Sequence, residues 1–245
     1  MSCLLGNQDA FGRLLYEHFR GKGQLGVIER DDGYVEAVDM AAIYGRAFTA
    51  WPIHERRALH WVRGRVLDIG CGAGRVALHL QRHGFDVVGV DNSPLAVTVY
   101  RLRGLKQVRV LSISDLSDEV GLFDTIVMFG NNFGLFSNPA RAKRLLKRFR
   151  RFTTDDARII AMTFDPHRTE KPEHRSYQRR NAARGRMVGQ IRLRIRYKRF
   201  ATPYYDYLFV SRAEMTRILE DTGWQVMRWV DSRGPAYAAI IGKHA

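Results

Sequence analysis

The sequence is poor in cysteine, with only Cys3 and Cys71 among 245 residues. Two cysteines exclude a disulfide scaffold and a cysteine-rich zinc or iron–sulfur site, so we expect no resident metal. No apolar run reaches the roughly 18 residues that a transmembrane helix needs. The first residues lack a basic stretch followed by a long apolar run, so we expect no signal peptide. Together these absences predict a cytoplasmic protein with no membrane partner.

Acidic residues are scarce as well, with 25 Asp and Glu against 40 Lys and Arg, a net charge of +15. The excess is local, because residues 141–199 hold 20 basic and 5 acidic residues, while the remainder holds 20 of each. A bias of base composition alone would spread the excess along the chain, although 33 of the 40 basic residues are arginine. This stretch therefore either binds something negative or turns charged faces to solvent.

From residue 65 onward, short apolar runs alternate with amphipathic segments. We expect strands at residues 65–69, 86–91, 108–112, 123–129, 157–164, 224–230 and 237–241, with helices at 75–83, 94–103, 139–152 and 212–222. Such alternation predicts a parallel sheet with helices on both faces. The last two strands are joined too tightly for a crossover helix and should be antiparallel. The predicted fold class is α/β, a doubly wound Rossmann-like seven-stranded sheet, mostly parallel with an antiparallel last strand.

The rest of the chain adds a lead-in and an insert. Residues 1–62 are expected to be a helical lead-in that covers the ligand site, with a helix over 9–20 and a largely helical stretch over 34–62. Residues 63–245 form the main domain, interrupted at about 166–210 by a basic insert. Within the insert, residues 191–198 alternate basic and apolar side chains, which predicts one arm of a β-hairpin.

A glycine-rich loop, Asp68-Ile69-Gly70-Cys71-Gly72-Ala73-Gly74, follows the first of these strands. Glycines permit a sharp turn and let a ligand touch the backbone, and the next helix offers free N–H groups. Asp91 ends the following strand, where its carboxylate can accept hydrogen bonds from ribose hydroxyls. The Gly-x-Gly-x-Gly spacing differs from the usual Gly-x-Gly-x-x-Gly of NAD-binding loops, which disfavours NAD. A tight turn without a ligand is the other alternative.

These residues resemble the class I S-adenosylmethionine-dependent methyltransferases. Asp68 to Gly74 match the first motif of that family, Asp91 matches its ribose-binding acid, and the strand order fits over residues 60–165. The resemblance implies S-adenosylmethionine as cofactor and S-adenosylhomocysteine as product. It places the adenine over Asn92 and its amino group near Ser114 or Asp115. The donor-site residues that it implies are Asp68, Gly70, Cys71, Gly72, Gly74, Asp91, Asn92, Ser114, Asp115, Gly130 and Asn131.

Two residues are candidates for catalysis, Asn131 and His167. Asn131 and Asn132 follow the fourth strand, where this family brings substrate and donor together, and either bind one of them or cap the next turn. The Asn/Asp-Pro-Pro-aromatic motif of amine- and glutamine-methylating relatives is absent, which argues against both activities. His167 follows the fifth strand and is either a general base or an exposed loop residue. We expect Cys71 to be a packing residue and not a nucleophile.

Tyrosines recur in the lead-in and in the insert. Tyr204, Tyr205 and Tyr207 either wall a substrate pocket or pack the insert onto the domain. Tyr34 and Tyr44 belong to the lead-in, which folds over the donor in this family, so either of them is a candidate to contact the donor carboxylate.

The basic arm of the insert bears on the acceptor. Arg192, Arg194, Arg196 and Lys198 share one face of the predicted strand and repel one another unless something negative covers them. The cover is RNA phosphate, an anionic small substrate or acidic residues of another subunit in a homo-oligomer; alternatively, the charges protect a sheet edge. The chain lacks the separate recognition domain that many RNA methyltransferases carry. We therefore expect a methyltransferase for a small or medium-sized acceptor, with RNA methylation and non-catalytic donor binding as alternatives.

Overall fold

The computed structural model describes residues 3–244, and the chain divides into two compact units. The first unit comprises Met1–Trp51, Gly64–Leu116 and Leu193–Tyr205. The second comprises Pro52–Arg63, Ser117–Arg192 and Asp206–Ala245. Each unit is therefore assembled from three separate stretches of the sequence.

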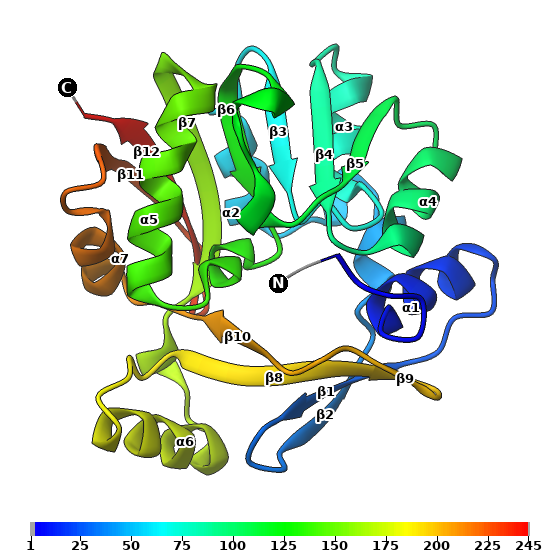
Figure 1. Cartoon of the computed structure of the whole chain (residues 1–245), viewed down its shortest axis with the longest axis vertical. Coiled ribbons are helices and arrows are strands. Elements are labelled where there is room, and N and C mark those ends of the chain that lie inside the picture. The colour runs from blue at the N-terminus through cyan, green and yellow to red at the C-terminus, as the bar shows by residue number, and fades with distance from the viewer. Residues whose placement is uncertain (1–2, 245) are drawn as a thin grey trace. The chain divides into compact units, whose positions relative to one another are not determined.

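Seven strands form one sheet in the order β11-β12-β7-β6-β3-β4-β5 (Figure 1). Their bounds are β3 Val66–Ile69, β4 Val87–Asp91, β5 Gln107–Val110, β6 Phe123–Met128, β7 Thr153–Phe164, β11 Trp224–Asp231 and β12 Ala236–Lys243. In the first unit β4 runs parallel to β3 and to β5. In the second unit β6 and β7 are parallel, whereas β12 is antiparallel to β7 and to β11. This topology confirms the predicted fold class, including the antiparallel last strand.

The central strands are apolar because they are covered on both faces. Every residue of β3 and β4 is buried, as expected of parallel strands that lie between layers of helices. The α-helices are α1 Ala10–Phe19, α2 Ile53–Leu59, α3 Arg75–Arg82, α4 Pro94–Leu102, α5 Pro139–Phe149, α6 Pro172–Ala183 and α7 Arg212–Leu219. The 3₁₀ helices are η1 Ala42–Gly45, η2 Phe48–Ala50, η3 Ile113–Asp115, η4 Asp118–Val120, η5 Asn132–Phe136, η6 Arg150–Phe152 and η7 Pro166–Arg168.

Local capping signals start three of these helices where the sequence predicted. The side chains of Ser93 and Asn138 each accept a backbone hydrogen bond, and a proline occupies the first turn of α4 and of α5. At α7, Ser211 and Glu214 form a reciprocal capping box.

A second sheet is built around the insert, with the order β10-β8-β1-β2 and with β9 paired to β8. Its strands are β1 Gly26–Arg30, β2 Val35–Val38, β8 Gln190–Tyr197, β9 Phe200–Ala201 and β10 Tyr205–Leu208. The prediction of a largely helical stretch over 34–62 is wrong for its first part. Gly33, with a φ of 88°, closes a turn that pairs β2 with β1, and β1 in turn pairs with β8. Helix appears only later, in η1, η2 and α2.

The insert contains more than the predicted hairpin. The basic strand is present as β8, and β9 turns back against it. However, α6 precedes it, and the sequence pattern did not predict this helix. The division into a lead-in and a main domain at residue 62 stays a prediction.

Candidate functional site

The glycine loop between β3 and α3 is shaped by three glycines in the left-handed region. Gly70, Gly72 and Gly74 have φ values of 70°, 53° and 75°. A Cβ atom on Gly72 would lie 2.1 Å from the Tyr44 hydroxyl oxygen. The loop backbone therefore lies directly against Tyr44, and a side chain at position 72 would close that space.

Asp91 binds the loop from the end of β4. Its Oδ2 accepts a hydrogen bond from the Gly72 N–H at 2.8 Å, and its Oδ1 accepts one from the Ser93 N–H at 2.9 Å. A carboxylate offers about four acceptor positions, so capacity remains for hydroxyl groups of a ligand. The arrangement fits a ribose, because vicinal hydroxyls can donate to the two oxygens.

Two buried carboxyl groups lie at this loop. Burial raises the pKa of Asp91 to about 6, and the charge of Asp9 adds to the rise while backbone N–H groups oppose it. Burial also raises the pKa of Asp68 to about 7, with a further contribution from Asp91. A cationic ligand would offset the cost of ionising two neighbouring buried acids, so the chemistry of the loop fits a sulfonium donor.

Arg103 ties the Tyr44 segment to the loop. Its Nη1 donates to the Ala73 carbonyl at 2.6 Å, and its Nη2 donates to the Tyr44 carbonyl at 2.7 Å. Burial and the nearby Asp91 raise the pKa of the Tyr44 phenol, which therefore stays a hydrogen-bond donor at neutral pH. Of the two lead-in tyrosines, Tyr44 is the one at the loop, whereas Tyr34 packs under the Arg30 guanidinium.

The other sequence-predicted donor residues of the first unit differ in exposure. The Asn92 carbonyl accepts a hydrogen bond from the Leu4 N–H at 2.9 Å. Ser114 is half-buried in η3, and Asp115 is exposed. Cys71 is buried, and burial raises the pKa of its thiol well above the ordinary value. It is therefore a poor nucleophile, in line with the expected packing role.

Gly130 and Asn131 lie in the second unit, in the turn after β6. Both have positive φ, 65° and 69°, and the side chain of Asn131 does not cap η5. The Tyr207 hydroxyl donates to the Asn131 carbonyl at 2.8 Å. A Cβ atom on Gly134 would lie 2.1 Å from the Tyr207 ring, so the ring packs tightly on this turn.

The insert tyrosines thus have different roles. The Tyr204 hydroxyl donates to Glu29 Oε1 at 2.7 Å, and the Arg194 guanidinium lies over its ring, so Tyr204 packs the small sheet. Tyr205 belongs to the first unit, where burial and then the charge of Asp91 raise its pKa. Only Tyr205 and Tyr207 therefore remain candidates for contact with a ligand.

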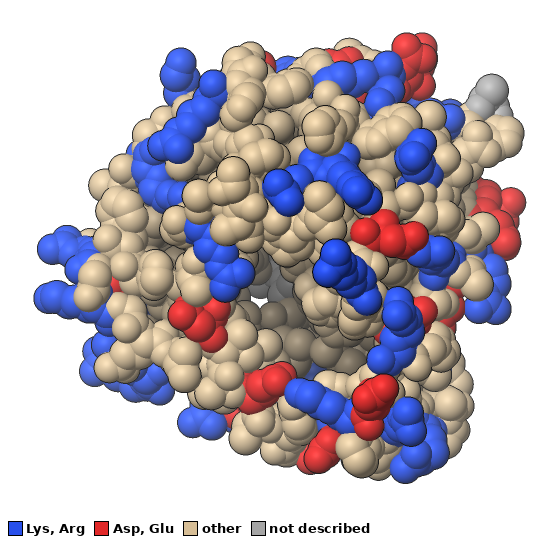
Figure 2. Space-filling view, turned by 180° about the vertical axis from the view of Figure 1, so that it is seen from behind, with Lys and Arg blue, Asp and Glu red and all other residues tan. Residues whose placement is uncertain are grey.

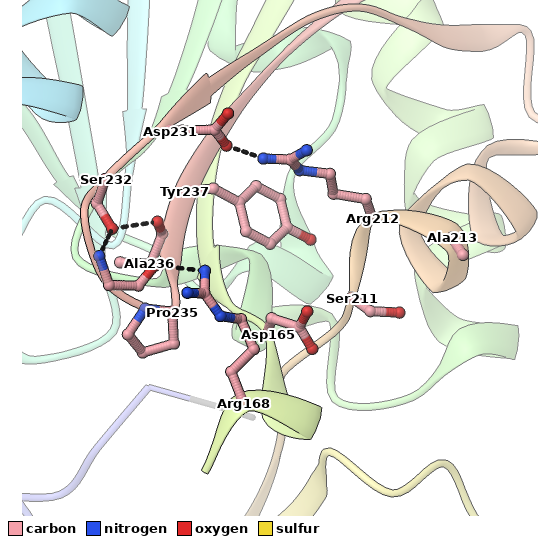
Figure 3. A pocket seen from close by; sticks show the side chains of 11 residues that line it. Asp165, Arg168, Ser211, Arg212, Ala213, Asp231, Ser232, Pro235, Ala236 and Tyr237 are labelled. Carbon is pink, nitrogen blue, oxygen red and sulfur yellow. Dashed lines mark hydrogen bonds and ion pairs between the residues drawn. The ribbon is translucent and has the colours of Figure 1, made fainter.

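His167 lies in η7, where its Nε2 is 3.4 Å from Glu214 Oε1. Beside it, the second unit has a pocket of about 510 Å³ (Figure 3). The pocket lining combines charged, hydroxyl and apolar groups from η7, α7 and the β11–β12 turn: Asp165, Arg168, Ser211, Arg212, Ala213, Asp231, Ser232, Gly234, Pro235, Ala236 and Tyr237. Figure 3 shows Arg212 directed at Asp231 and Arg168 bound to the Gly234 carbonyl. Both arginines of the pocket thus bind residues of its own lining.

The basic face of β8 is covered by acidic residues of the same chain. Arg194 and Arg196 both bind Glu29, at 2.8 and 3.0 Å. In the second unit Arg192 lies 3.6 Å from Asp206. Lys198 binds Glu17 of α1. The predicted repulsion along this strand is therefore relieved within the chain.

Basic side chains nevertheless dominate the charged surface. Figure 2 shows Lys and Arg spread over one face of the molecule, with fewer acidic side chains among them. Within residues 3–244 no helix has both the length and the apolar composition needed to cross a membrane. The same residues contain no group of three His, Cys, Asp or Glu side chains that could hold a metal ion.

Comparison with known proteins identifies the family. The sequence model of the methyltransferase domain matches residues 40–228, more than half of the chain. A human ATP synthase lysine N-methyltransferase is 34% identical over 118 residues, which are 46% of this chain and 47% of that protein. The ubiquinone biosynthesis O-methyltransferase of Xanthomonas oryzae pv. oryzae is 40% identical over 68 residues, 25% of this chain and 28% of that protein. The chain thus spans less than half the length of these curated relatives.

Solved structures show the same fold over the whole chain. A SAM-dependent methyltransferase from Bacteroides fragilis, in complex with S-adenosyl-L-homocysteine, superposes with a TM-score of 0.85. It covers 100% of this chain and 98% of its own, at 24% identity. The chain therefore belongs to the methyltransferase domain family, with the class I fold and with S-adenosylmethionine as the cofactor that this family and fold imply.

Proposed function

We propose that the chain transfers a methyl group from S-adenosylmethionine to a small or medium-sized acceptor. The observation that carries this proposal is the Asp91 carboxylate bound to the backbone of the glycine loop at Gly72. A buried acid held in this way next to a loop open at its glycines is suited to the ribose of an adenosine. In this proposal the donor is bound by the sequence-predicted residues of the first unit, together with Tyr44.

The residues of the loop would bind and orient the donor more than they would react. S-adenosylmethionine, when bound, supplies a methyl group that is already activated by the sulfonium charge. Asp91 accepts from the ribose hydroxyls, and the ionised Asp68 and Asp91 together attract a cation. The Tyr44 hydroxyl offers a donor beside Gly72. Transfer then requires in-line alignment of the acceptor atom at about 3 Å, which is a matter of positioning.

A small acceptor is favoured by the pairing of the insert's charges. The basic face of β8 was the feature that suggested RNA, and Glu29 and Asp206 neutralise it within the chain. RNA binding through this strand would have to displace those carboxylates. A general base is needed only for an acceptor that keeps its proton, and His167 beside Glu214 is the candidate for that role.

The proposal is tested in two steps. Calorimetry with S-adenosylhomocysteine measures donor-site binding in the wild type, and absence of binding would refute the assignment. A transfer assay with labelled S-adenosylmethionine is then run on a cell extract split into small-molecule, RNA and protein fractions. We expect label in the small-molecule fraction, and label confined to RNA or protein would overturn the acceptor class. Binding without label in any fraction would indicate a non-catalytic donor-binding protein.

A further inference from the structure

Asp9, the N-cap residue of α1, binds the turn that follows Asp91. Its Oδ1 accepts hydrogen bonds from the Ser93 hydroxyl at 2.7 Å and from the Gly12 N–H at 2.9 Å. Its Oδ2 accepts a hydrogen bond from the Leu95 N–H at 3.0 Å. The side chain is fully buried, and α1 lies beside α4 (Figure 1). One carboxylate therefore joins the start of α1 to the start of α4.

The same turn continues to the ribose acid. Ser93 caps α4 through its hydroxyl, which accepts from the Ala96 N–H at 3.0 Å, while its own N–H donates to Asp91. Asp91 in turn accepts from the Gly72 N–H. A continuous series of buried hydrogen bonds thus runs from α1 through Ser93 and Asp91 to the glycine loop.

Packing holds α1 closely against this turn. A Cβ atom on Gly12 would lie 2.2 Å from Ser93 Oγ, so the close approach depends on the missing side chain. The Leu4 N–H donates to the Asn92 carbonyl, which adds a backbone contact from the segment before α1. Helix capping needs only one side-chain oxygen, and Ser or Thr would provide it. The second oxygen of Asp9 is used on Leu95, so this carboxylate does more than cap its own helix.

We propose that Asp9 is a positioning residue for donor binding, which holds the turn from Asn92 to Leu95 so that Asp91 faces the ribose hydroxyls. It acts through Ser93 and Leu95 and not by contact with the reacting atoms. This inference rests on the proposed function, because it assigns to Asp91 the ribose of the donor.

The test is calorimetry with S-adenosylhomocysteine on the full chain and three variants. Asp9→Asn and Ser93→Gly should each weaken binding by about tenfold, the equivalent of roughly one buried hydrogen bond. Ser93→Gly removes the hydroxyl link but keeps the backbone N–H on Asp91, and glycine is tolerated at an N-cap. Glu17→Gln is the matched control, because Glu17 lies on the same helix and binds Tyr197 and Lys198 instead. Its affinity should equal that of the wild type.

A pH profile separates positioning from simple loss of stability. The charge of Asp9 is one cause of the raised pKa of Asp91. Asp9→Asn should therefore shift the pH midpoint of S-adenosylhomocysteine affinity downward, which a merely less stable fold would not do. The other titratable groups that act on Asp91 or are acted on by it stay the same in this variant: Asp68 on β3, Cys71 in the loop, Tyr44 on η1 and Tyr205 on β10.

The outcomes distinguish the two proposals. A wild type that does not bind S-adenosylhomocysteine refutes the proposed function itself. A wild type that binds, with a folded Asp9→Asn variant of equal affinity and equal pH midpoint, overturns only the role of Asp9. Circular dichroism establishes folding, and if Asp9→Asn does not fold, unchanged affinity in Ser93→Gly overturns the inference alone.

Discussion

Gly72→Ala tests the contact between the glycine loop and Tyr44. The new methyl group would lie 2.1 Å from the Tyr44 hydroxyl oxygen and 3.0 Å from Cζ. Gly72 has a φ of 53°, and the left-handed region costs an L-residue roughly 1–2 kcal/mol. Steric overlap in a packed site adds on the order of 1–3 kcal/mol. We expect the free energy of unfolding to fall by about 2–5 kcal/mol, as the sum of these two costs.

The double variant separates the two costs. Tyr44→Phe removes the hydroxyl oxygen and with it the shortest overlap, but it leaves the backbone strain at Gly72 unchanged. In that background Gly72→Ala should cost only about 1–2 kcal/mol, so the two changes should be coupled by about 1–3 kcal/mol. Urea unfolding followed by circular dichroism gives all four corners of the cycle. Additive costs would show that Tyr44 does not lie on the loop.

Gly45→Ala is the matched control for this cycle. Gly45 belongs to the same segment as Tyr44, has no atom within 4 Å of an added Cβ and needs no left-handed backbone. Its substitution should change the free energy of unfolding by no more than about 0.5 kcal/mol. A large loss there would mean that the whole segment, and not position 72, is sensitive to added bulk.

Three further predictions concern the carboxyl groups. Asp91→Ala should weaken S-adenosylhomocysteine binding by about 100-fold or more, since charge-assisted hydrogen bonds contribute about 1.5–3 kcal/mol each; equal calorimetric affinity would contradict the ribose assignment. Affinity should rise with pH up to about 7, as Asp91 and Asp68 ionise at pKa values of about 6 and 7. In the free protein these raised pKa values mean that the native state keeps protons which the unfolded state has lost, so the free energy of unfolding should fall between about pH 4 and 7. A flat profile in either titration would argue against burial of the two acids. Glu29→Ala should leave donor binding intact and expose Arg194 and Arg196, so retention on heparin at low salt should increase; unchanged retention would mean that these arginines are not masked by Glu29.

Much of the large sheet could be predicted because its signals are local. The central strands are continuous apolar runs, and Ser93-Pro94, Asn138-Pro139 and the pair Ser211 and Glu214 mark helix starts within a few residues of sequence. The small sheet gave no such signal. β1 and β2 are stabilised by pairing with β8, and Val27 pairs with Arg196 far along the chain. α6 was missed because only Tyr177 and Asn181 are buried on it, which leaves no apolar stripe to recognise.

The candidate site follows the same division. The glycine loop and Asp91 could be read from the sequence, because a contiguous motif and the end of the next strand carry them. Tyr44 could only be named as one of two tyrosines. Arg103 and the second role of Asp9 depend on contacts with Ala73 and Leu95 that only the folded chain creates. The N-cap position of Asp9 before an amphipathic run was visible, but a cap alone does not indicate its partner in another helix.

The basic stretch shows how charge read from sequence changes its meaning on folding. Alternation along β8 correctly predicted a basic face, yet Glu29, Glu17 and Asp206, which neutralise it, come from elements that no local pattern connects to it. The uncompensated charge therefore lies elsewhere. On α5, Lys143, Arg144 and Lys147 have no acidic partner among residues 3–244, while the opposite face of the helix is buried. An amphipathic helix with a solvated basic face explains this charge without an anionic partner, so salt-dependent binding of RNA is not needed to account for the composition of the chain.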